Sequence, residues 1–155
     1  MVKLIRTDAT NQDLQELVRL LDQELAFRDG ADHSFYAQFN TIDQIRHAII
    51  AYADNRAVGC GAFKAFGDDA VEIKRMFVRS EVRGQRIAEQ VLFALETWAI
   101  EIGVVRCVLE TGAKQPEAIR LYQRSGYERI PNYGQYAGVE NSVCMQKILV
   151  GLISE

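Results

Sequence analysis

The stretch that decides the fold is VEIKRMFVRSEVRGQRIA, residues 71–88. Its first half, residues 71–78, is rich in apolar and β-branched side chains, which predicts a strand. From Gly84 onward, apolar residues recur at helical spacing as far as Ile102, and Gly103 supplies a stop. A strand therefore leads through a short basic turn into a long helix, and this turn is the first candidate for function.

The composition is that of a globular protein with an ordinary core. The chain has 155 residues, of which 48% are hydrophobic and 25% charged. These figures predict a single domain over residues 1–155 and argue against intrinsic disorder. Three widely spaced cysteines among apolar neighbours predict buried thiols and a reducing, cytoplasmic setting. His33 and His47 are expected to be structural or exposed, and we expect no metal site.

Charge and hydropathy limit the partners that we expect. The net charge of −3 argues against nucleic acid. The apolar stretches, such as residues 48–52, are far shorter than the ~18–20 residues of a bilayer span, and residues 1–8 lack the apolar region of a signal peptide. By contrast, residues 74–86 carry five positive charges and one negative charge. A short basic stretch in an acidic chain predicts a local site for an anion.

Outside this stretch the pattern alternates between strand-like and helix-like segments. The expected strands are residues 3–8, 47–52, 58–66, 70–78, 104–111, 127–130 and 142–149. One further helix is expected to begin after an N-cap at Thr10 and to end near Phe27. Another is expected to open at Gln115-Pro116 and to close at Ser125-Gly126. Residues 31–46 are predicted to be irregular or to form a short helix.

The basic turn has the chemistry of a phosphate site. A helix N-terminus presents unpaired N–H groups and about half a positive charge. Gly84 lets the main chain approach a ligand closely, and Arg83 and Arg86 add charge. A diphosphate would be held there mainly by main-chain donors. An ordinary strand-to-helix connection with solvated arginines is the alternative interpretation.

Two segments resemble the GNAT N-acetyltransferase superfamily. Residues 72–88 resemble its acetyl-CoA signature, Q/R-x-x-G-x-G/A, with Arg83 in the first place, Ala88 in the last, and Arg86 where the pattern has glycine. Residues 115–127 resemble the family's N-x-x-A-x-x-L-Y-x-x-x-G-F/Y segment, with Gln115 in place of asparagine. The resemblance implies an α/β (mixed α+β) fold, the GNAT acyl-CoA N-acyltransferase fold. Its central, twisted, mostly antiparallel sheet has about six or seven strands and is flanked by about four helices.

The resemblance also implies acetyl-CoA as co-substrate. Its pantetheine arm would lie along the strand at Met76–Val78, where the N–H of Met76 or Phe77 would face the thioester oxygen. Its diphosphate would meet the main chain of Arg83–Glu89. The implied cofactor-binding residues are Met76, Phe77, Val78, Arg83, Gly84, Gln85, Arg86, Ile87, Ala88, Glu89 and Gln115.

Three side chains are candidates for the chemistry. Tyr122 matches the tyrosine that serves as general acid in many members, and a ring that packs the helix on the sheet is the alternative. Glu72 lies where some members carry a general base, and its alternative is an exposed strand carboxylate paired with Lys74. Glu110 ends an apolar strand and is a competing base or an anchor for the substrate amine, and its alternative is a carboxylate that caps the turn at Thr111-Gly112.

The acceptor is expected to be a primary amine of a small molecule, such as an amino acid or a polyamine. The loop at residues 131–142, with Tyr133 and Tyr136, suits a small polar acceptor, although a hairpin connection or a dimer contact is also open. A non-catalytic CoA-binding module, a protein or peptide acceptor, and another acyl donor are alternatives. A homodimer is implied only by the resemblance.

Overall fold

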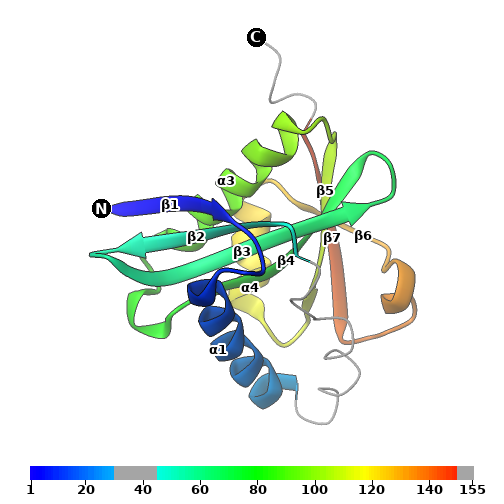
Figure 1. Ribbon diagram of the computed structural model, residues 1–155. Helices are drawn as coiled ribbons and strands as arrows, with labels where there is room; N and C mark the ends of the chain where they lie inside the picture. Colours follow the sequence, from blue (N-terminus) through cyan, green and yellow to red (C-terminus); the bar gives the residue numbers. More distant parts are fainter. Residues whose placement is uncertain (30–44, 150–155) are drawn as a thin grey trace. The chain divides into compact units, whose positions relative to one another are not determined.

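The computed structural model describes residues 1–29 and 45–149. Its elements in chain order are β1 (Val2–Thr7), α1 (Gln12–Asp29), β2 (His47–Ala53), β3 (Arg56–Phe66), β4 (Ala70–Val78), η2 (Ser80–Val82), α3 (Ile87–Glu101), β5 (Arg106–Gly112), α4 (Pro116–Arg124), β6 (Glu128–Ile130), η3 (Gly134–Tyr136) and β7 (Ser142–Ile148) (Figure 1). Seven strands hydrogen-bond in the order β1-β2-β3-β4-β5-β7-β6. The chain divides into two compact units, residues 1–64 with 74–95 and residues 65–73 with 96–155.

The first unit contains the N-terminal antiparallel strands. β2 is the middle strand, and both β1 and β3 run antiparallel to it. A two-residue turn joins β2 to β3, and its residues Asp54 and Asn55 have positive φ angles of 52° and 65°. Short polar residues tolerate this region, which two-residue hairpin turns require because it matches the twist of the strands. The predicted hairpin is confirmed.

Helix α1 packs its apolar side on these strands. The buried cluster contains four residues of α1, which are Leu14, Leu17, Val18 and Leu21. Its strand residues include Ala48, Ile50, Cys60, Ala62 and Phe77. The helical spacing of the leucines and valine predicted this side. Burial of one such side chain contributes about 1.5–3 kcal/mol, so this contact fixes α1 on the sheet.

The N-cap of α1 differs from the prediction. The side-chain oxygen of Asn11 accepts hydrogen bonds from the N–H groups of Asp13 and Leu14, at 2.8 and 3.2 Å. The hydroxyl and N–H of Thr10 are instead bound to the carboxylate of Asp8, at 2.6 and 3.0 Å. Asn11 is therefore the cap in place of Thr10, because its side-chain oxygen accepts the N–H groups of the first turn of α1.

Helix α3 approaches β3 closely in the first unit. A Cβ atom at Gly61 would lie 2.9 Å from both Val91 Cγ1 and Leu95 Cδ1. The helix can pack this closely on β3 because residue 61 has no side chain. The predicted apolar stripe is buried at Ile87, Val91, Leu92, Leu95 and Ala99, with Trp98 half-buried. The inclusion of Ile102 was wrong: it is 49% exposed, because α3 ends at Glu101.

The second unit adds the parallel strand pair. β5 runs parallel to the first half of β4, with Ala70 opposite Arg106 and Ile73 opposite Leu109. β7 pairs antiparallel with both β5 and β6. The sheet is therefore mixed and mostly antiparallel, as predicted, and three helices belong to the described part of the chain. The short helix considered for residues 31–46 lies almost wholly outside the described residues, as does His33.

The thiols are buried as predicted. Cys60, Cys107 and Cys144 are free and enclosed, and burial raises the pKa of both Cys60 and Cys107 to about 12. His47 stacks on Phe63 with ring centroids 4.8 Å apart, which is a packing role. Among the described residues, no helix is long and apolar enough to cross a bilayer.

Candidate active site

The basic turn forms as a strand, a short 3₁₀ turn and a helix. β4 ends at Val78, η2 spans Ser80–Val82, and α3 begins at Ile87. Gly84 and Arg86 both lie in the left-handed region, with φ angles of 88° and 63°. The first helical hydrogen bond runs from the N–H of Gln90 to the carbonyl of Arg86. The N–H groups of the first turn of α3 consequently have no acceptor within the helix.

This turn is open to solvent. Residues 83–86 are all exposed, and a Cβ atom at Gly84 would meet no heavy atom within 4 Å. The side chain of Arg86 is 82% exposed, and its guanidinium lies 3.7 Å from the carboxylate of Glu89. The main chain between Arg83 and Glu89 therefore has the room and the donors that a bound diphosphate needs.

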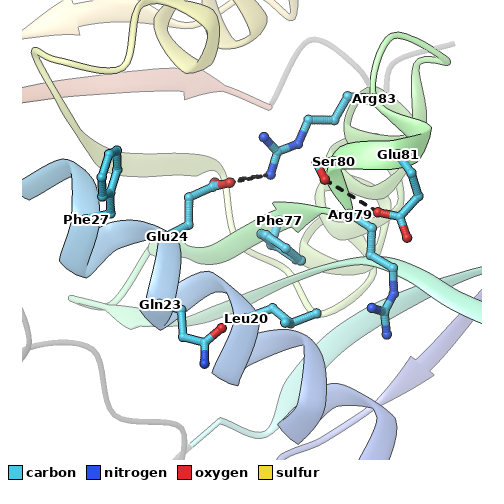
Figure 2. Close-up of a pocket in the computed structure, with 9 residues that line it drawn as sticks. All are labelled: Leu20, Gln23, Glu24, Phe27, Phe77, Arg79, Ser80, Glu81 and Arg83. Carbon is cyan, nitrogen blue, oxygen red and sulfur yellow. Dashed lines mark hydrogen bonds and ion pairs between the residues drawn. The ribbon is translucent and has the colours of Figure 1, made fainter.

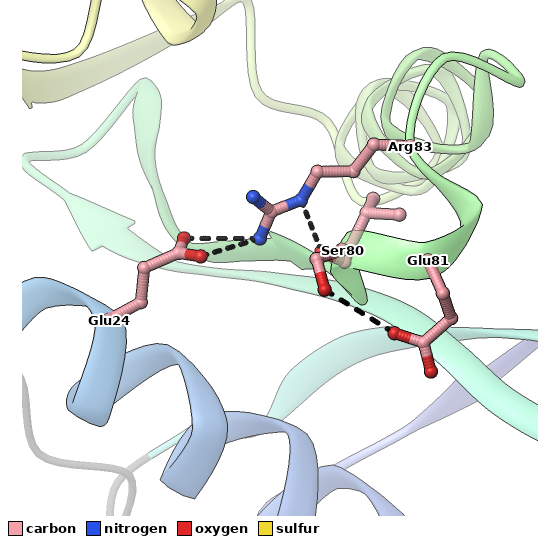
Figure 3. Close-up of polar contacts among 5 residues, drawn as sticks. Glu24, Ser80, Glu81 and Arg83 are labelled. Atoms are coloured by element: carbon pink, nitrogen blue, oxygen red, sulfur yellow. Dashed lines mark hydrogen bonds and ion pairs between the residues drawn. The ribbon is translucent and has the colours of Figure 1, made fainter.

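The side chain of Arg83 is engaged by the protein itself. Its Nε donates to the carbonyl of Val78 at 2.8 Å, and its Nη2 contacts both carboxylate oxygens of Glu24, at 2.8 and 3.1 Å (Figure 3). The guanidinium also lies 5.6 Å from the centre of the Phe77 ring. Arg83 therefore joins α1 to the end of β4 in this structure.

Two other cations of the basic stretch are also used within the first unit. Arg75 is buried and paired with Asp22, while its Nε is buried without a hydrogen-bond partner among the described residues. Arg79 donates through Nε to the carbonyl of Ala57 at 2.7 Å. The charge count over residues 74–86 therefore overstated the positive charge available to a ligand. Of the five cations, Lys74 and Arg86 are the remaining two, and Arg86 lies in the turn itself, beside the main-chain donors.

A cavity of about 410 Å³ lies beside the turn. Figure 2 shows the side chains that surround it, which come from α1, the end of β4, η2 and the two residues that flank η2: Leu20, Gln23, Glu24, Phe27, Phe77, Arg79, Ser80, Glu81 and Arg83. Its lining combines apolar side chains with two carboxylates and two guanidinium groups. Such a site can take a ligand that is apolar along its length and polar at one end. Sequence analysis missed this cavity because α1 and η2 are far apart in the chain.

Met76–Val78 are the last three residues of β4 and belong to the first unit. Phe77 and Val78 are 8% exposed, and Met76 is half-buried. Just before them, Arg75 has a φ of 60°, a rare conformation for a strand residue that is not glycine. This conformation interrupts the regular alternation of β4 immediately before the segment predicted to meet the pantetheine arm.

Glu72 is buried in the second unit. It is only 2% exposed, and one of its carboxylate oxygens accepts a hydrogen bond from the hydroxyl of Tyr133 at 2.7 Å. The alternative of an exposed strand carboxylate is therefore wrong. Glu72 lies opposite Val108 on β5, and Glu110 follows two residues later, so both carboxylates are on one side of the sheet. Glu110 is half-buried.

The tyrosines of the β6–β7 loop lie over this acidic side. The Tyr133 ring meets the rings of Phe66 and Tyr136 edge to face, with centroids 4.8 and 5.9 Å apart. Tyr136 is 2% exposed. Burial, and then Glu72, raise the pKa of Tyr133, while burial, Glu110 and Glu72 raise the pKa of Tyr136. Both phenols therefore stay protonated at working pH.

Tyr122 is buried on α4. It is 7% exposed and contacts Tyr127 edge to face, with centroids 5.8 Å apart. Burial, and then the charge of Glu110, raise the pKa of Tyr122, so its hydroxyl retains a proton to donate. Gln115, predicted to bind the cofactor, is the half-buried N-cap residue of α4, and its side chain makes no cap hydrogen bond.

The predicted site residues thus fall into two groups. Met76–Val78 and Arg83–Glu89 belong to the first unit, whereas Glu72, Glu110, Gln115, Tyr122, Tyr133 and Tyr136 belong to the second. Among the described residues, no three His, Cys, Asp or Glu side chains gather so that they could hold a metal ion.

Comparison with known proteins shows the family of this chain. The model of the acetyltransferase (GNAT) family matches residues 11–127. The chain belongs to the GNAT acetyltransferase family. It is accordingly an N-acetyltransferase with the GNAT acyl-CoA N-acyltransferase fold, as the two motifs predicted.

Individual relatives agree with this GNAT assignment. An IAA acetyltransferase of Azospirillum brasilense is 29% identical over 96% of this chain and 98% of its own length. A crystal structure from Klebsiella pneumoniae, named for an acyl-CoA N-acyltransferase, is 28% identical, with a TM-score of 0.81 over 96% of this chain and 98% of the other. The PaiA N-acetyltransferase of Thermoplasma acidophilum, solved with coenzyme A, shares the fold at 15% identity, with a TM-score of 0.72 over 96% of this chain and 99% of that one.

Proposed function

We propose that this GNAT enzyme transfers an acetyl group from acetyl-CoA to the primary amine of a small molecule. The observation that carries the proposal is the turn before α3. Its main chain is exposed, two of its residues have left-handed φ angles, and a Cβ atom at Gly84 would touch nothing. An open main chain that leads into a 15-residue helix suits a diphosphate.

Acetyl-CoA, when bound, supplies the activated acyl group. The main chain of Arg83–Glu89 would hold its diphosphate, and the strand residues Met76–Val78 would bind its pantetheine arm. Gln115 is proposed to contribute from the start of α4. An N–H of the strand would polarise the thioester carbonyl, which is the type of stabilisation that acyl transfer needs most.

The amine must lose a proton before it can attack. Glu72 and Glu110 lie on one side of the sheet, and two carboxylates there suit a substrate ammonium group. We assign Glu72 as the base that takes this proton and Glu110 as the anchor of the acceptor. Tyr136, beside both carboxylates, would contact the acceptor through its ring. A small acceptor is favoured because Tyr136 is buried and Tyr133, half-buried, already occupies one oxygen of Glu72.

Tyr122 is the proposed general acid. Once the new C–N bond has formed and the C–S bond breaks, the departing sulfur needs a proton. The buried phenol of Tyr122 holds one at working pH, because burial and Glu110 both raise its pKa. The same burial makes a lasting phenolate costly, so Tyr122 would donate its proton only as negative charge develops on the sulfur.

The test is thiol release, measured with DTNB, from acetyl-CoA across a panel of primary amines. We expect turnover well above the hydrolysis background with the purified enzyme. Tyr122→Phe should lower kcat about 100-fold, within the usual range for general acid catalysis, and leave CoA affinity by calorimetry unchanged.

The matched control is Tyr127→Phe, which removes a hydroxyl from the ring that touches Tyr122. Its kcat should change far less. An unchanged kcat in Tyr122→Phe would exclude the acid role. Absence of amine-dependent thiol release from a protein that binds acetyl-CoA would refute the proposed acceptor class.

A further inference from the structure

We propose that Tyr133 is a positioning residue for Glu72, and that the two act as one unit during acetyl transfer. The inference rests on the proposed function, in which Glu72 takes the proton of the amine. Sequence analysis grouped Tyr133 with the residues that touch the acceptor. Its hydroxyl is instead directed at the carboxylate of Glu72, so Tyr133 acts through Glu72.

The geometry of the pair is specific. The Tyr133 hydroxyl donates to Glu72 at 2.7 Å, and the two residues are 61 positions apart in the chain. A charge-assisted hydrogen bond of this length is about twice as strong as one between neutral groups. Because Glu72 is 2% exposed, this donor replaces water that the carboxylate would otherwise bind.

The Tyr133 ring is fixed independently of this hydrogen bond. Phe66 and Tyr136 pack edge to face against it. The loop that carries the ring is also cross-linked by hydrogen bonds. The side-chain N–H₂ of Asn132 donates to the carbonyls of Val139 and Ser142, at 3.0 Å each. A ring held from two sides keeps its hydroxyl at one place, and this fixes the carboxylate that accepts from it.

The direction of the hydrogen bond is set by the charges around it. Burial and the adjacent Glu72 raise the pKa of Tyr133, so the phenol remains the donor at any pH at which the enzyme would work. The other groups that bear on this cluster are Glu110, the Cys144 thiol and Arg129. Arg129 is a cation, and its charge lowers the pKa of the Cys144 thiol against the larger effect of burial.

A second tyrosine–glutamate pair in the same unit provides an internal comparison. Tyr127 donates to the buried carboxylate of Glu96 at 2.9 Å, and Lys147 donates to its other oxygen, also at 2.9 Å. Glu96 is therefore a neutralised structural carboxylate. Both pairs join a tyrosine donor to a buried glutamate, although Tyr127 is buried and Tyr133 half-buried, and only Glu72 is assigned to the chemistry.

The experiment is a double-mutant cycle in kcat and KM for the full-length protein. It uses Tyr133→Phe, Glu72→Gln and the double variant, with Tyr127→Phe as control, and thermal unfolding is recorded for each. Phenylalanine keeps the ring contacts of Tyr133. We expect Tyr133→Phe to lower kcat about tenfold with KM within about twofold, since only the hydrogen bond to Glu72 is lost.

The double variant should be no slower than Glu72→Gln, because residues that act as a unit are not additive. In both of these variants residue 72 is uncharged, so neither leaves a buried charge unpaired. Their comparison therefore tests the coupling of Tyr133 to Glu72 even if Tyr133→Phe alone is unstable. A rise in KM with kcat unchanged, an additive double variant, or an equal loss in Tyr127→Phe would overturn the inference. An unchanged kcat in Glu72→Gln would instead refute the proposed base.

Discussion

Arg86 offers the sharpest test of the turn before α3, because its conformation and its charge can be separated. The residue has a φ of 63°, where the GNAT pattern has glycine. Its side chain is 82% exposed and reaches Glu89 at 3.7 Å, a contact that contributes little in solvent. Arg86→Gly and Arg86→Ala remove the same charge, but only glycine adopts this φ without a penalty.

The expected magnitude follows from the backbone. A left-handed conformation costs a residue with a Cβ about 1–2 kcal/mol, and the greater entropy of glycine in the unfolded chain offsets part of this advantage. We therefore expect the free energy of unfolding of Arg86→Gly to exceed that of Arg86→Ala by about 1 kcal/mol. For a protein of this size, the difference corresponds to about 2–4 °C in Tm.

The assays are thermal unfolding and calorimetry with coenzyme A. If the main chain of this turn grips the diphosphate in this conformation, Arg86→Gly should bind CoA more tightly than Arg86→Ala, because alanine favours relaxation of the free turn away from the left-handed φ, which binding must then restore. Equal Tm values for the two variants would refute the strain at this position. Equal CoA affinities, with both weaker than the native protein, would show that Arg86 acts through its charge alone.

Two further predictions concern the ion pairs that end on α1. Glu24→Gln should tighten CoA binding by up to about fivefold in calorimetry, since Arg83 is then released toward the diphosphate; weaker binding would show that Glu24 holds Arg83 in its working position. Asp22→Asn should lower the free energy of unfolding by about 2–3 kcal/mol in urea, because it leaves the buried Arg75 uncompensated. The control Glu16→Gln, in an exposed pair on the same helix, should cost far less, and equal losses would contradict the prediction.

Local patterns predicted the elements that make the turn. The alternation of residues 71–78, the helical spacing after Gly84 and the stop at Gly103 each depend on neighbours within a few positions. Such signals operate before any tertiary contact exists, so strand, turn and helix follow from them. The same patterns fail at ends: Ile102 continues the apolar spacing, although the helix has already stopped one residue before it.

The two motifs were sufficient to predict the GNAT family. They did not predict which charged side chains of this chain are already paired within the protein. Arg83 was assigned to a ligand because of its charge. Its nearest carboxylate, Glu24, is 59 residues away in the chain, and no local pattern connects them. Arg75 was likewise counted as available charge, although helix α1 covers it and pairs it with Asp22.

The sequence by itself determined the order of strands and helices, the family and the position of the turn before α3, since each is encoded in short-range spacing. Only the tertiary structure decided which charges are already neutralised and which carboxylate is buried. Glu72 is the clearest case: an exposed carboxylate and a buried one were equally compatible with its strand. In the structure, the β6–β7 loop brings the hydroxyl of Tyr133 within 2.7 Å of the Glu72 carboxylate, which is buried. Burial and hydrogen-bond partners depend on long-range packing, which the local sequence does not encode.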